Sequence, residues 1–151
     1  MTHDAYKQLI ETLEEEIRAL SHLAQVDAHI AANAAKFSTV ELKSASFDRE
    51  RWVGQLEVLA GRRLRQLQVI AGNSAPSRHL SDVIRSAPAE WVASLKATHA
   101  KLGSVAQDAL NARAAAGSAL NIAMNATGAK LRFLAAATGE RPRTSRIETD
   151  V

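Results

Sequence analysis

Residues 88–138 read PAEWVASLKATHAKLGSVAQDALNARAAAGSALNIAMNATGAKLRFLAAAT, a stretch without proline after its first position. Its apolar side chains recur mostly three, four or seven positions apart, which is the spacing of one face of an α-helix. They are Trp91, Leu95, Leu102, Val105, Ala109, Ala116, Leu120, Met124, Leu131 and Leu134. Such a helix would extend roughly 75 Å at 1.5 Å per residue. We therefore predict one long helix that packs against another long helix to bury this stripe.

The composition favours an all-α fold in a single domain. Of the 151 residues, 46% are hydrophobic but only 4% are aromatic, and segments of alternating polarity are few, so a β-sheet has little to build on. The absence of cysteine excludes disulfides, thiol catalysis and cysteine-bound metal. No apolar run approaches ~18 residues, and acidic Asp4 and Glu11 stand where a signal peptide would be basic and then apolar. We expect a cytoplasmic protein without membrane insertion.

The same periodicity predicts three further helices, which gives helices at about 4–36, 47–71, 79–85 and 88–138. Asp4 can cap the first helix, and no glycine or proline stops it before Lys36. The pattern loosens between Phe37 and Phe47, where Ser46 is a plausible cap for the second helix, and Gly72 is a typical residue for its end. We predict an elongated antiparallel helical bundle or coiled-coil hairpin over residues 1–138, with Gly139 ending the long helix and a mobile polar tail over 139–151.

The two tryptophans are expected to be anchors of the hydrophobic core. Trp52 lies in the second predicted helix and Trp91 in the last, which are expected to face each other. An exposed role in binding a partner is the alternative.

The sequence contains several clusters of charged and polar residues, each with more than one possible role. Acids early in the first helix complement the positive end of its macrodipole, and they are Glu11, Glu14, Glu15 and Glu16. A run of arginines could contact phosphates or form ion pairs on the helix surface, and it comprises Arg49, Arg51, Arg62, Arg63 and Arg65. His22 and His29, with Asp27 nearby, are about 10 Å apart along a helix, which is too far for one metal ion. No catalytic motif, metal site or cofactor site is expected.

Certain residues between positions 7 and 138 follow one another in a characteristic order and spacing. They are Leu9, Leu13, Glu16, Leu20, Asp27, Ile30, Lys36, Arg49 or Arg51, Leu56, Leu59, Gly61, then Leu80, Ile84, Leu95, Leu102, Leu110, Asn111, Leu120, Leu131 and Leu134. This pattern resembles that of flagellar export chaperones of the FlgN type. The resemblance concerns helical spacing and carries no catalytic fingerprint.

The resemblance implies a cytoplasmic chaperone for hook-filament junction proteins. Such a chaperone binds the C-terminal helical segments of those proteins, keeps them soluble and delivers them to the flagellar export apparatus of the type III kind. By analogy, the partner-binding residues would be Leu110, Leu120, Met124, Leu131, Leu134 and, in the tail, Ile147. Two alternatives stay open: a self-associating structural or adaptor coiled coil, and a weak nucleic-acid binder that uses the basic middle segment.

Overall fold

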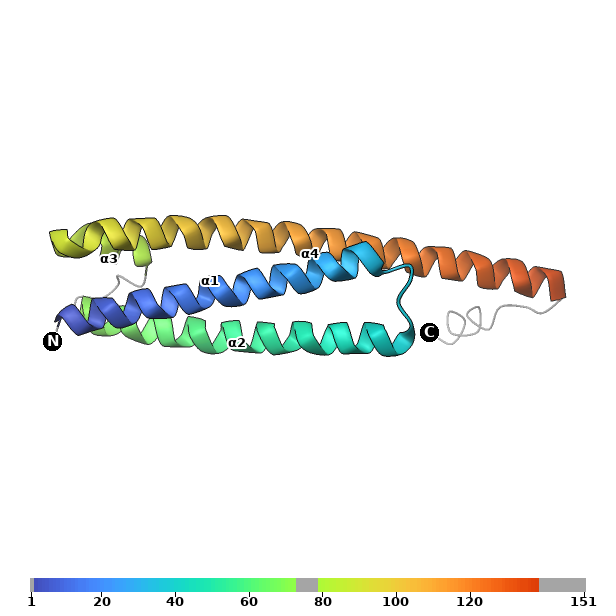
Figure 1. The fold of residues 1–151 in the computed structure, drawn as a ribbon, viewed down its shortest axis with the longest axis horizontal. Helices are drawn as coiled ribbons and strands as arrows, with labels where there is room; N and C mark the ends of the chain where they lie inside the picture. Colours follow the sequence, from blue (N-terminus) through green and yellow to red (C-terminus); the bar gives the residue numbers. More distant parts are fainter. Residues whose placement is uncertain (1, 73–78, 139–151) are drawn as a thin grey trace, which may run out of the picture.

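The computed structural model of the chain describes residues 2–72 and 79–138, and these form four helices and no strand. The helices are α1 (Thr2–Asn33), α2 (Thr39–Ala71), α3 (Leu80–Ser86) and α4 (Ala89–Thr138). Figure 1 shows them as an elongated bundle, which confirms the predicted all-α architecture. The predicted tail and the helix stop at Gly139 lie outside the described residues.

Helix α1 lies between α2 and α4 and packs against both (Figure 1). Among the described residues, α2 and α4 do not pack against each other, and the short α3 contacts both of them. α2 runs antiparallel to α1 and returns the chain to the end at which it began, so α4 runs parallel to α1. The molecule is therefore an antiparallel hairpin with a longer helix laid along its first arm.

The hydrophobic core is concentrated at the end of the bundle where all four helices meet. There apolar side chains of α1 lie against those of the other three helices, and the buried members of this cluster are Tyr6, Leu9, Leu13, Leu67, Val83, Ile84 and Leu95. Farther along α4 the buried residues are only Ala109 and Ala116. Buried apolar side chains also continue along the interface of α1 and α2, at Ile17, Leu23, Ile30 and Leu59, but α4 buries only small side chains beyond the α3 end, and burial energy grows with apolar area.

The turn between α1 and α2 differs from the prediction. α1 ends at Asn33, three residues before the predicted end at about Lys36, and α2 begins eight residues earlier than expected, so Ser46 lies inside α2 and is not its cap. The cap is Ser38, whose hydroxyl accepts a hydrogen bond from the Glu41 backbone N–H, while the Glu41 carboxylate accepts one from the Ser38 N–H. This capping box satisfies two backbone donors at once, which makes Ser38 the stronger start signal.

The start of α1 lies two residues before the predicted position, and the remaining helix ends agree with the predictions to within one residue. α2 is followed by Gly72, whose φ of 63° is readily adopted only by glycine, and its N–H donates to the Gln68 carbonyl. Pro88 directly precedes α4, and its carbonyl accepts a hydrogen bond from the Trp91 N–H at 2.9 Å.

Both tryptophans are half-buried against α1. Trp91 stacks on Tyr6 with 6.2 Å between ring centroids and packs against the core. Trp52 stacks on His22, with 4.5 Å between centroids, at the surface between α1 and α2. The expectation that these two segments face each other was wrong, because α1 separates α2 from α4.

Candidate partner-binding surface

Helix α4 extends past the end of α1. Glu14, Ile17 and Arg18 of α1 lie beside Ala97, Thr98 and Lys101 of α4, and extending this parallel register at equal rise per residue gives a position near Ala116 for the end of α1 at Asn33. Ala116 is the last buried residue of α4. Residues 117–138, which we call the overhang, continue for roughly 33 Å, and their far part extends beyond the whole bundle (Figure 1).

The face of α4 that packs on α1 continues along the overhang, and its large apolar side chains become exposed beyond Leu120. Leu120, Met124, Leu131 and Leu134 follow the buried Ala109 and Ala116 at helical spacing, and we call these four residues the packing stripe. Leu120 is half-buried, Met124 and Leu134 are exposed, and 62% of the Leu131 surface is exposed. The stripe loses its cover because α1 ends before it.

Four of the six predicted partner-binding residues therefore lie together on the overhang. Leu110 is also exposed, but it belongs to the part of α4 that runs beside α1, at the flank of the buried face. Ile147 lies outside the described residues. The structure groups Leu120, Met124, Leu131 and Leu134 as one surface and leaves Leu110 apart from it.

A second exposed apolar group on the overhang was missed from the sequence. Ile122 and Phe133 are 68% and 75% exposed, and their separation of about three helical turns places them on one side of α4. Ile122 is two positions from Leu120, so this rear pair points away from the packing stripe. The sequence signal for this pair was the spacing of two large apolar residues eleven positions apart, but neither residue belongs to the main apolar stripe.

The overhang carries positive charge only. Residues 109–138 contain Arg113, Lys130 and Arg132 and no aspartate or glutamate. Lys130 and Arg132 are exposed on either side of Leu131 in the sequence, and neither forms an ion pair with a residue that the structure describes. The surface offered to a partner is therefore apolar with a basic border.

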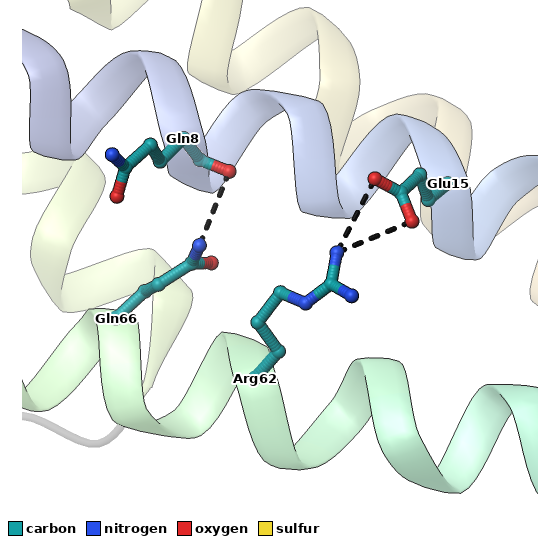
Figure 2. Close-up of polar contacts among 4 residues, drawn as sticks. All are labelled: Gln8, Glu15, Arg62 and Gln66. Atoms are coloured by element: carbon teal, nitrogen blue, oxygen red, sulfur yellow. Dashed lines mark hydrogen bonds and ion pairs between the residues drawn. The ribbon is translucent and has the colours of Figure 1, made fainter.

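Three of the five arginines in the α2 run form ion pairs with acidic residues of α1. Arg49 Nε donates to Asp27 Oδ1 at 2.9 Å, and Arg63 Nη1 donates to Glu16 Oε2 at 2.8 Å. Figure 2 shows the third pair, in which Arg62 reaches both carboxylate oxygens of Glu15 at 3.2 and 3.3 Å. Of the two interpretations of this cluster, ion pairing on the helices therefore accounts for these three arginines.

Polar contacts fix the register of the hairpin along its length. Beside the Glu15 pair, Gln66 Nε2 donates to the Gln8 carbonyl oxygen at 3.3 Å (Figure 2). Glu15 and Glu16 thus bind across to α2, in addition to lying in the N-terminal half of α1. Arg51 instead lies over the Trp52 ring, 5.3 Å from its centroid.

Burial raises the pKa of the Glu16 carboxyl above its ordinary value of 4.5, although the charge and the hydrogen bond of Arg63 act in the opposite direction. The folded chain therefore holds this proton more tightly than the unfolded chain. The stability that Glu16 contributes is fully present below the unfolded pKa and is lost as pH rises through the raised folded pKa.

Glu16→Gln removes this titration and keeps a side chain that can accept a hydrogen bond from Arg63. We expect the stability of the natural protein relative to this variant to be highest near pH 4 and to fall as pH rises toward 7. Urea unfolding of both proteins across this range measures the difference. Glu15→Gln is the matched control at an exposed pair, and an equal trend in both variants would contradict the assignment to the buried position.

The described residues contain no group of three or more histidine, cysteine, aspartate or glutamate side chains placed to hold a metal ion. His22 stacks on Trp52, and His29 lies near Phe37 and within 3.2 Å of the Asn33 amide nitrogen.

None of the described helices combines the length and apolarity needed to cross a bilayer. The overhang is therefore the surface that we take as the candidate site.

No known family profile, curated protein sequence or solved structure matches this chain. The exposed surface of α4 and the helical spacing of the sequence are therefore the two features that bear on function.

Proposed function

We propose that the chain is a non-enzymatic, cytoplasmic type III export chaperone for hook-filament junction proteins. It binds their C-terminal helical segments, keeps them soluble and delivers them to the flagellar export apparatus. The observation that supports this proposal is the uncovered packing stripe on the overhang, at which an apolar face that α1 covers elsewhere is left open. The resemblance in helical spacing to FlgN-type chaperones supports the same assignment.

The physical basis is helix-in-groove recognition. An amphipathic client helix that follows α1 along α4 would bury Met124, Leu131 and Leu134 as α1 buries Ala109 and Ala116. The same client helix, left alone, would expose its apolar face and self-associate. Binding to the overhang would therefore hold the client soluble without any chemical step.

Leu131→Asp should weaken binding of a junction protein's C-terminal helical fragment at least about tenfold, which corresponds to about 1.4 kcal/mol. A carboxylate in the middle of the stripe would lose its hydration under the client helix. Helicity should be unchanged, because Leu131 is not part of the core. Calorimetric titration measures the affinity, and circular dichroism checks the fold.

Asn121→Asp is the matched control, since it adds the same charge to the overhang outside the packing stripe. We expect it to bind within about twofold of the natural protein. A folded Leu131→Asp variant with undiminished binding, or a natural protein that binds no junction fragment, would overturn the proposal.

A self-associating adaptor is the second candidate, because the same exposed stripe could accept another copy of this chain. Light scattering of the purified protein separates the two. A chaperone without its client stays monomeric as its concentration rises, whereas an adaptor forms dimers or larger species that Leu131→Asp dissolves.

A further inference from the structure

The overhang is apolar on two opposite sides. The packing stripe occupies one side, and the rear pair Ile122 and Phe133 occupies the other. Between the two members of the rear pair, Ala126 and Ala129 keep this side free of charge. A helix with apolar residues around most of its circumference is normally buried between neighbours, whereas one client helix would cover one side only.

The bundle already contains a helix in that position. α1 lies between α2 and α4, its core residues Leu9 and Leu13 are fully buried, and the two flanking helices do not touch each other. The overhang has the same need for two neighbours, but no other described helix lies beside its far part (Figure 1). Two helices supplied from outside would give it the surroundings that α1 has.

Charge indicates what those helices carry. Lys130 and Arg132 are exposed, and the last thirty residues of α4 contain no acid. A second copy of the overhang would bring further basic residues and no carboxylate to pair with them. A partner with aspartate or glutamate beside its apolar positions would instead form complementary pairs with Lys130 and Arg132.

We propose that the overhang inserts as the central helix between two helices of one partner, a helical hairpin whose apolar seams are bordered by acidic residues. One partner helix covers the packing stripe and the other covers Ile122 and Phe133. This inference rests on the proposed function only in taking the overhang as the binding surface, and it adds the architecture and charge of the partner.

The test uses the full chain and three designed peptides as probes. They are a two-helix hairpin with leucine seams bordered by glutamate, the same hairpin bordered by lysine, and one helix of the glutamate form. We expect the glutamate hairpin to bind at least about tenfold more tightly than either of the others, and its affinity to fall as salt rises. Fluorescence anisotropy of labelled peptides gives the affinities.

Variants of the chain test the two sides separately. Leu131→Asp and Phe133→Asp should each weaken binding of the glutamate hairpin at least about tenfold, whereas Asn121→Asp should stay within about twofold. Replacing Lys130 and Arg132 together with glutamate should reverse the preference toward the lysine hairpin. Circular dichroism confirms that each variant keeps its helicity.

Three results would overturn the inference. Phe133→Asp could bind the glutamate hairpin as tightly as the natural protein does, the single helix could bind as well as the hairpin, or sedimentation could show a dimer of the natural protein that Phe133→Asp dissociates. The proposed function fails separately. If the glutamate hairpin binds but a junction fragment does not, the chaperone assignment is removed and this inference is kept. If Leu131→Asp weakens binding of a junction fragment but Phe133→Asp does not, the proposed function is kept and this inference is removed.

Discussion

Replacing Arg49 with alanine should lower the free energy of unfolding by about 3 kcal/mol, one of the two largest effects that we expect from a single substitution. The Asp27 side chain is 1% exposed, and the Arg49 guanidinium is the group that neutralises it, at 2.9 Å. Its second carboxylate oxygen, Oδ2, is buried and has no hydrogen-bond partner among residues 2–72 and 79–138. Removal of the arginine would therefore leave a buried charge without compensation.

The loss arises from desolvation, and a surface pair should not show it. Arg62→Ala is the control, because Arg62 and Glu15 are both partly exposed and water can replace the arginine. We expect it to cost less than about 1 kcal/mol. Urea unfolding followed by circular dichroism measures both variants. Equal losses for Arg49→Ala and Arg62→Ala would show that the burial of Asp27 does not decide the energetics.

Leu13→Ala should lower the free energy of unfolding by about 3 kcal/mol. Leu13 is fully buried in the core where α1 meets the other three helices, so truncation removes apolar burial and leaves a cavity. The loss should be the same with and without a partner on the overhang, because Leu13 packs with Val83 and Ile84 of α3, away from residues 117–138.

Leu134→Ala makes the same chemical change on the overhang and serves as its control. Since Leu134 is exposed, we expect a change within about 0.5 kcal/mol in the isolated protein. The same urea series measures it. A loss comparable with that of Leu13→Ala would mean that the packing stripe is already covered in the free protein, which would contradict its assignment as a binding surface.

The long helix could be predicted from the sequence because its signal is local. Apolar residues at helical spacing and the absence of proline after Pro88 predicted α4 to within one residue at its start. The start of α2 was equally local but was misplaced, since Ser46 was preferred to Ser38. The pair of Ser38 and Glu41 three positions later is a capping box, which is the more specific signal.

The partners of each helix could not be predicted in the same way. Arg49 and Asp27 are paired because the turn between α1 and α2 sets the register of the hairpin, and no periodicity within one helix contains that information. Likewise, the stripe through Leu120 and Leu131 was recognised as apolar, but its exposure depends on where α1 ends. The rear pair of Ile122 and Phe133 was missed because a single stripe was sought.

The position of the main core cluster at the α3 end of the bundle has a consequence for how this chain can vary. Along α4, the residues of this cluster are separated from the exposed apolar residues of the overhang, where we propose that a partner binds. On the proposed function, changes in residues 117–138 that preserve helicity would alter what is recognised while leaving the folded state almost untouched. New specificities can therefore arise here by ordinary point substitution, free of the trade-off that constrains proteins whose binding site is cut into their core.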